Sequence, residues 1–310
     1  MNRTALGSFM AAMLLSAGAA PAQTAPATAA APLKVCLSED NAPLSTMRQR
    51  QMVGFDAALA QAVGRELGRE VRLVPFEPEV EKEAMLTHEV NALLSSGVCD
   101  LVTGFPLLKS DLGAPTRARF KAPDHPGAKP PRERPYIELG TLIHSQPYLG
   151  SALVVVQRAD APAARGLGDL KGRKVAAVAG TLEGTLIAMY GGGALNAGMV
   201  SMGQREDVWA ALKSGRVDAL LVPTTALDAH RQREPASTVQ AGPPRPLGIN
   251  LGFVALAAQA PLLDAVNRVV ARAQAGGDLQ RWASDAGLSW VPPTAPVVAD
   301  TLKLDALLGD

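Results

Sequence analysis

Two short stretches combine residues that can bind a small charged molecule. Gly180 and Thr181 stand between an apolar run and a helical pattern. A hydroxyl and free backbone N–H groups at such a helix N-terminus can hold an anion, although Thr181 could equally serve as a simple helix cap. Asp40 and Asn41 follow another apolar run, and open α/β sheets bind ligands at the carboxyl ends of their strands. We therefore expect all four residues to line a binding site.

Residue patterns typical of an enzyme do not accompany these stretches. Glu183 could act as an acid or base, but the helix dipole also favours a carboxylate in the first turn of a helix. The sequence has no Gly-x-Ser-x-Gly stretch, no cysteine with a suitable histidine and no phosphate-binding loop. Its four histidines are scattered singly, unlike a set of metal ligands. We expect no catalysis, no metal and no cofactor.

The composition is compatible with one large domain or two lobes, each with its own core. The chain has 310 residues, 47% of them hydrophobic, and a net charge of +1. A balance so close to neutral gives no reason to expect a nucleic-acid partner or a strong attraction to membranes.

The N-terminus resembles a secretory signal. A short positive start precedes an apolar stretch, and Ala20-Pro21-Ala22 has small residues where a signal peptidase reads them. We expect residues 1–22 to be removed by cleavage after Ala22, and residues 23–32 to be a disordered leader. The alternative is a transmembrane anchor, for which the stretch is short and rich in alanine.

The first part of the chain alternates strands and helices. The expected strands are 33–37, 71–76 and 101–103; one helix starts at Gly54-Phe55-Asp56 and stops at Gly68, and a second covers 81–95. This order favours a parallel sheet with right-handed crossovers, in which the first strand can lie between the other two. Residues 38–43 are expected to form the loop that leaves the first strand.

The two cysteines support this arrangement. Cys36 lies in the first expected strand, and Cys99 lies at the entry to the third. Cysteines of an exported protein usually pair, and neighbouring strands would bring these two within bonding reach, so we expect a disulfide. The alternative is two free buried thiols. Asp100 is expected to hydrogen-bond to the backbone at the strand entry.

Residues 109–144 interrupt the alternation. This stretch has seven Lys and Arg residues against four Asp and Glu, with several prolines, and it predicts a long, basic, extended loop. It is either a solvated surface insertion or a docking surface.

A second α/β unit follows the insertion. Tyr148 marks the crossover into it and is expected either to pack or to form a wall of the cleft. The later elements are strands at 152–157, 174–179, 217–222 and 251–258, and helices beginning near Leu182 and covering 205–214, 224–230, 260–275 and 279–286. The proline-rich tail from Val291 ends in a weak helix over 298–308.

An ordered series of segments resembles one family. The series consists of Gly54-Phe55-Asp56, Cys99-Asp100-Leu101-Val102, Ser145-Gln146-Pro147-Tyr148, residues 169–175 with Gly180-Thr181, and residues 211–219. It is similar to the family 3 periplasmic solute-binding proteins of the polar amino-acid type, which are receptors of ABC importers. The similarity covers roughly residues 33–290.

The resemblance implies a specific architecture and location. The fold would be the two-lobed type 2 periplasmic-binding fold, each lobe a mixed, mainly parallel sheet flanked by helices, closing over a ligand in the periplasm. Lobe 1 would comprise 33–150 and 251–290, lobe 2 would comprise 151–250, and 291–310 would be a tail.

The family's ligand-binding residues are only partly present. Gly104-Phe105-Pro106-Leu107 stands where the family has a carboxylate-binding arginine, Pro223-Thr224-Thr225 stands where it has an acidic ammonium partner, and Leu44 replaces an aromatic residue. A buried charge without a partner is costly, so a free α-amino acid would lack two expected contacts. The ligand-binding residues that we expect are Asp40, Asn41, Gly104, Phe105, Tyr148, Gly180, Thr181 and Thr224.

Two functions follow from the resemblance. The first is capture of a small polar or anionic, amino-acid-like solute by a monomer that delivers it to an ABC permease. The alternative comes from Asn41-Ala42-Pro43 and the cysteine context, which resemble a subgroup associated with quinoprotein alcohol dehydrogenases. The protein would then be a periplasmic partner or maturation factor of such a dehydrogenase.

Overall fold

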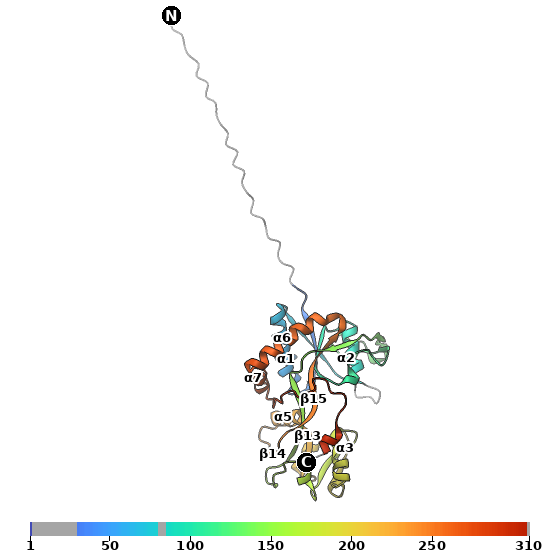
Figure 1. Cartoon of the computed structure of the whole chain (residues 1–310), viewed down its shortest axis with the longest axis vertical. Coiled ribbons are helices and arrows are strands. Elements are labelled where there is room, and N and C mark those ends of the chain that lie inside the picture. The colour runs from blue at the N-terminus through green and yellow to red at the C-terminus, as the bar shows by residue number, and fades with distance from the viewer. Residues whose placement is uncertain (2–29, 80–84, 309–310) are drawn as a thin grey trace. The chain divides into compact units, whose positions relative to one another are not determined.

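The computed structural model describes residue 1, residues 30–79 and residues 85–308. The expected signal peptide and most of the expected leader lie outside these residues, as does the start of the second expected helix. The chain from Ala31 onward forms one compact unit (Figure 1).

The first part of this unit has the predicted parallel order. Strand β1 (Leu33–Ser38) lies between β5 (Val71–Phe76) and β6 (Leu101–Pro106), and both pairings are parallel. Helix α1 (Phe55–Leu67) ends at Gly68, whose φ of 61° is the left-handed conformation that glycine adopts readily. Helix α2 (Leu86–Ser95) completes the alternation. The expected strand order is therefore confirmed.

The disulfide is also confirmed. Cys36 and Cys99 are bonded, with 5.7 Å between their Cα atoms, and both are buried. Beside them, the Asp100 carboxylate accepts a hydrogen bond from the backbone N–H of Lys34 at 2.9 Å, the backbone contact expected for it. The hydrogen bond of Asp100 and the disulfide thus both join β1 to the residues just before β6.

The segment after β1 is not the simple loop that we expected. It forms a small antiparallel sheet of β2 (Asp40–Asn41), β3 (Ser45–Arg48) and β4 (Gln51–Val53). The β3–β4 turn uses Gln49 and Arg50 with φ of 50° and 65°. Such turns usually carry glycine or asparagine, so this hairpin could not be predicted from its turn residues.

The basic insertion is anchored rather than merely solvated. Its short strands β7 (Arg119–Phe120) and β8 (Ile137–Glu138) pair with each other. Arg134 is only 8% exposed, and its guanidinium donates hydrogen bonds to the carboxylates of Glu79 at 3.1 Å and Asp124 at 3.0 Å. The expectation of a long extended stretch holds for most of the insertion, but a buried arginine ties it to the end of β5.

The remaining elements complete both halves of the fold. The strands are β9 (Leu142–His144), β10 (Leu149–Arg158), β11 (Val175–Val178), β12 (Met199–Met202), β13 (Ala219–Pro223), β14 (Val239–Ala241) and β15 (Arg245–Leu256). The helices are α3 (Leu182–Met189), α4 (Val208–Lys213), α5 (Thr224–Arg233), α6 (Ala260–Gly276), α7 (Asp278–Asp285) and α8 (Leu304–Leu308). The main order is β12-β11-β13-β10-β15-β6-β1-β5, in which β10 and β15 are long antiparallel strands. The sequence did not predict β9, β12 or β14. Strand β9 lies in the stretch that was expected to be a loop, and it is a strand because it pairs with the distant β15.

Four buried hydrophobic clusters flank the sheet, two in each half. Around β1, one includes residues of α1, α6 and α7, and the other residues of α2. Around β13, one includes residues of α3 and the other residues of α4 and α5. We call these halves lobe 1 and lobe 2. The lobe boundaries drawn from the sequence stay a prediction.

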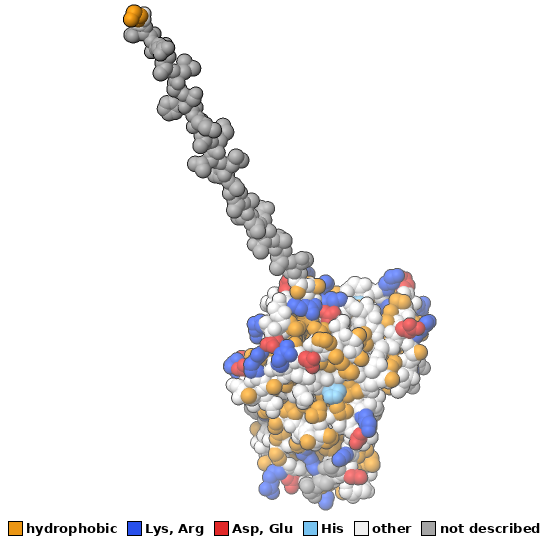
Figure 2. All heavy atoms as spheres, turned by 45° about the horizontal axis from the view of Figure 1, so that its top comes forward, with side chains coloured by type: hydrophobic (Ala, Val, Ile, Leu, Met, Phe, Trp, Pro, Cys, Tyr) orange, Lys and Arg blue, Asp and Glu red, His pale blue; other side chains and the backbone are white. Residues whose placement is uncertain are grey.

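The charged surface is mixed on the face shown in Figure 2. Lys and Arg side chains stand in separate groups, several with Asp or Glu beside them, rather than in one basic patch. Within the described part of the chain, no helix is both long enough and apolar enough to cross a membrane.

Candidate functional site

A hollow of about 500 Å³ lies where the segment after β1 faces helix α5. Both lobes contribute its lining, which comprises Asp40, Asn41, Ala42, Thr46, Met47 and Arg48 from lobe 1 and Thr225, Ala226, Ala229, Gln232 and Arg233 from lobe 2. We call it the interlobe hollow. It contains two of the residues predicted to bind ligand, Asp40 and Asn41.

The small sheet positions the lobe 1 side of this hollow. Asp40 lies opposite Thr46 across the β2–β3 pair. Helix α1 has no side-chain cap, and the backbone N–H groups of Phe55 and Asp56 instead donate to the carbonyls of Pro43 and Leu44. The segment that carries the polar lining is therefore fixed to the start of α1, because it supplies the acceptors that a helix N-terminus needs.

Helix α5 positions the lobe 2 side. Thr225, Ala229 and Gln232 are spaced by one helical turn and share one face of α5. Gln232 accepts a hydrogen bond from the Arg48 guanidinium at 2.9 Å and donates one to the carbonyl of Ala286 at 2.7 Å. This side chain thus joins α5 to lobe 1 at two points beside the hollow.

The charges of the interlobe hollow favour an anionic group. Arg48 and Arg233 bring two guanidinium groups, against the single carboxylate of Asp40. Guanidinium is always charged and matches the geometry of a carboxylate with paired N–H donors. Neither arginine could be predicted from the sequence, because the two come together only in the tertiary structure.

The residues predicted near α3 lie elsewhere. The Thr181 hydroxyl accepts from the backbone N–H of Gly184 at 3.0 Å and donates to the carbonyl of Val178 at 2.9 Å, so it caps α3 as the alternative expected. Thr181 lines a separate small pocket of about 100 Å³ with Glu183 and Pro223. Gly180 is exposed, whereas Thr224 is buried at the start of α5. Their contact with a ligand stays a prediction.

Three other predicted ligand residues lie in the interior or beside it. Tyr148 is 0% exposed and Phe105 is 2% exposed, so packing surrounds both side chains. The Tyr148 hydroxyl donates to the Asp56 carboxylate at 2.9 Å and accepts from the backbone N–H of Gly104 at 2.7 Å. Of the two expectations for Tyr148, the structure shows packing, and ligand contact by these three residues stays a prediction.

Asp56 is a buried acid that the sequence analysis treated only as part of a helix start. Burial raises its pKa from 3.8 to about 7, and the hydroxyls of Tyr148 and Thr103 oppose this effect only in part. Gly104 has a φ of 66°, and a Cβ there would lie 3.0 Å from the Asp56 carboxylate. Only glycine suits this position, so Gly104 serves the buried cluster.

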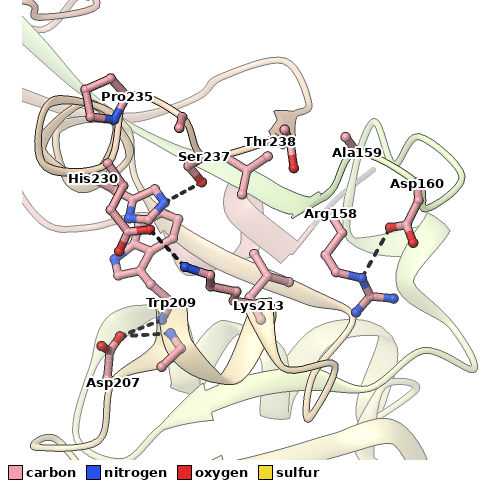
Figure 3. A pocket seen from close by; sticks show the side chains of 15 residues that line it. Arg158, Ala159, Asp160, Asp207, Trp209, Lys213, His230, Pro235, Ser237 and Thr238 are labelled. Atoms are coloured by element: carbon pink, nitrogen blue, oxygen red, sulfur yellow. Dashed lines mark hydrogen bonds and ion pairs between the residues drawn. The ribbon is translucent and has the colours of Figure 1, made fainter.

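A larger hollow of about 820 Å³ belongs to lobe 2 alone (Figure 3). The rings of Trp209 and His230 stack in parallel at its wall, with 3.9 Å between centroids. The cations at its rim have anionic partners, since Lys213 lies 3.6 Å from Glu234 and Arg158 lies 3.2 Å from Asp160. We call it the lobe 2 hollow.

Among the described residues, no group of His, Cys, Asp and Glu could hold a metal ion.

Comparison with known proteins finds likeness at the level of structure. No protein-family model and no curated protein matches the sequence. Substrate-binding domain 2 of GlnP from Lactococcus lactis, solved in an open conformation, matches with a TM-score of 0.60 and 15% identity over 84% of this chain and 96% of that one. The second substrate-binding domain of a putative amino-acid ABC transporter from Streptococcus pneumoniae gives 0.60 and 16% over 83% and 100%. An ancestral cationic amino-acid solute-binding protein gives 0.55 and 20% over 82% and 94%.

These similarities extend over most of the chain at low identity. None of the three names a dehydrogenase, so the dehydrogenase alternative gains no support from them. Over the matched 82–84% of the chain, its described residues share the mixed α/β fold of these substrate-binding domains, as the sequence resemblance implied.

Proposed function

We propose that this protein is exported to the periplasm, where as a monomer it binds a small polar or anionic, amino-acid-like solute between its lobes and delivers it to an ABC permease. The observation that carries the proposal is the interlobe hollow, where Arg48 and Arg233 converge from different lobes on a space that also holds Asp40. The names of the structural neighbours, which include amino-acid transporter domains, support it.

The lining suits a solute that carries at least one carboxylate. Arg233 is exposed at the end of α5, and Arg48 spends one of its donors on Gln232. Both therefore retain N–H donors for an incoming anion. Asp40 offers a partner for an ammonium group, and Asn41 and Thr46 can hydrogen-bond to either end of a zwitterion. These groups take the place of the family's missing arginine and acid.

Closure follows from the division of the lining between lobes. A solute held by Arg48 alone or by Arg233 alone would gain only part of the available interaction energy. Simultaneous contact with both favours the conformation in which the lobes are close, and a ligand shifts such an equilibrium by its difference in affinity for the two states. Exclusion of water then strengthens the polar contacts.

A solute screen with a matched pair of variants tests the proposal. We expect thermal-shift measurements with amino acids and dicarboxylates to find a stabilising solute, followed by calorimetric titration of the best one. Arg233→Gln should weaken binding about tenfold or more, the equivalent of roughly 1.4 kcal/mol. Arg231→Gln, an exposed arginine on the same helix outside the hollow lining, serves as the control and should bind normally.

Two outcomes would refute this function. One is the absence of any stabilising solute across the panel. The other is a solute whose affinity responds equally to Arg231→Gln and Arg233→Gln, because binding would then not depend on the interlobe hollow.

A further inference from the structure

We propose that the C-terminal segment, residues 291–308, is a strap that connects the two lobes across the crossover strands and limits how far they open. We call it the C-terminal strap. From the sequence, these residues were predicted to be a proline-rich tail with a weak helix. The structure instead fixes them at three successive places, first on β10 and β15, then on lobe 1, and finally on lobe 2.

The strap first lies directly on the crossover strands. The backbone N–H of Gly150 in β10 donates to the carbonyl of Val291 at 2.8 Å. A Cβ on Gly150 would come within 2.6 Å of the Pro292 carbonyl oxygen, so the close approach of the two backbones requires glycine. Just before the strap, the Trp290 indole N–H donates to the carbonyl of Tyr148 at 3.0 Å.

Asn250 holds the middle of the strap. It lies opposite Gly150 in the β10–β15 pair and is 0% exposed. Its Oδ1 accepts from the backbone N–H of Thr294 at 2.9 Å, and its Nδ2 lies 2.8–3.1 Å from the carbonyls of Thr294, Pro296 and Val297. A buried amide satisfied entirely by the strap would lose several hydrogen bonds if the strap left.

The strap next joins the end of β6 in lobe 1. Ala299 and Leu108 form a parallel bridge. The backbone N–H of Ala299 donates to the carbonyl of Leu107 at 3.0 Å, and the N–H of Lys109 donates to the carbonyl of Ala299 at 2.9 Å. These contacts lie just after the carboxyl end of β6. Sheets of α/β proteins commonly bind ligands at the carboxyl ends of their strands.

The strap ends in the core of lobe 2. Leu307 of α8 is 5% exposed within the same cluster as Leu186 and Ile187 of α3, and α8 contacts α3 directly (Figure 1). Leu302, Leu304 and Leu308 pack against the same cluster. Four leucines thus hold a helix too short to be stable by itself, because the burial of apolar surface stabilises it.

The short distance along the chain between the last two anchors makes the strap a limit on opening. Ala299 is bound to lobe 1, and Leu304 begins the helix on lobe 2. An extended chain spans at most about 3.6 Å per residue, so these two points cannot separate by more than roughly 18 Å while both anchors hold. Wider opening requires the release of α8 or of the Ala299 bridge.

Spin-label distances between the lobes test the strap without any solute, so the result does not depend on the proposed function. Leu307→Asp should release α8, and termination after Trp290 should remove the strap. We expect both variants to give a longer or broader interlobe distance distribution than wild type. Lys303→Ser, an exposed strap position, is the control and should match wild type. Unchanged distributions in both variants would overturn the proposal.

A measurement on the unaltered protein covers the case in which a variant does not fold. In hydrogen exchange of the wild type, the amides of Ala299 and Lys109 should be protected at least tenfold more than those of an unstructured chain, because each is a donor in the bridge. Exchange of both at the unprotected rate would show that the strap is not bound, and would equally overturn the proposal.

Discussion

The interlobe hollow and the lobe 2 hollow differ in a way that size does not reveal. The lobe 2 hollow is the larger, about 820 Å³ against about 500 Å³, yet its rim cations are already neutralised by Glu234 and Asp160. In the interlobe hollow, two arginines from different lobes face one carboxylate. Available charge, rather than volume, is therefore the feature that singles out the interlobe hollow as the proposed binding site.

The largest effect concerns Asp56, at the start of helix α1. The backbone of this helix start holds the segment that lines the lobe 1 side of the interlobe hollow. Because the folded pKa of Asp56, about 7, lies above the unfolded value of 3.8, its stabilising contribution is complete below pH 3.8 and is lost as pH rises through 7. At about 1.36 kcal/mol per pKa unit, this amounts to roughly 4 kcal/mol over the whole range, of which roughly 3 kcal/mol is lost above pH 5. Asp56→Asn should remove that part of the pH dependence of unfolding by urea between pH 5 and pH 8. An unchanged slope in the variant would contradict the assignment.

The stacked pair in the lobe 2 hollow should matter for stability alone. Trp209→Ala removes the half-buried ring that stacks on His230 and should lower the free energy of unfolding by roughly 2 kcal/mol. Solute affinity, measured by calorimetry well below the melting temperature of the variant, should not change. A loss of affinity in a folded Trp209→Ala protein would indicate that the solute binds in the lobe 2 hollow instead of the interlobe hollow.

Two substitutions in the β3–β4 hairpin test whether the solute contacts the interlobe hollow. Arg48→Met should reduce solute affinity about tenfold, because it removes one of the two converging guanidinium groups. Arg50→Met, two residues further on and outside the hollow lining, should leave affinity unchanged. Equal affinities for the two variants would mean that Arg48 does not contact the solute.

The smallest effect is expected for the rim of the lobe 2 hollow. Lys213 and Glu234 form an exposed ion pair, and such pairs contribute about 0.5 kcal/mol or less. The double variant Lys213→Met/Glu234→Gln should therefore unfold at nearly the wild-type urea concentration and bind solute normally. Weakened binding would show that these charges serve a ligand rather than each other.

Local pattern was sufficient to predict much of lobe 1. Apolar runs bounded by Gly54 and Gly68 predicted α1 and its neighbouring strands, and the alternation of strands and helices predicted that β1 lies between β5 and β6. The disulfide followed from that order, because Cys36 and Cys99 belong to adjacent strands. These features depend on residues close in sequence or on a general rule of topology.

The two arginines of the interlobe hollow and the C-terminal strap could not be predicted in the same way. The turn that presents Arg48 uses Gln49 and Arg50 at positive φ, without the usual glycine signal. Arg48 and Arg233 are distant in sequence and meet only through the packing of two lobes. The strap has little periodicity, and four of its hydrogen bonds come from one side chain, Asn250, far from it along the chain.

Nuclear magnetic resonance on the intact protein can show whether the solute binds in the interlobe hollow or in the lobe 2 hollow. On titration with the best solute from the screen, the amides of Asn41, Thr46 and Thr225 should shift, because they line the interlobe hollow, whereas the indole N–H of Trp209 should not. Shifts of the Trp209 indole with unmoved amides at the other three positions would contradict the account.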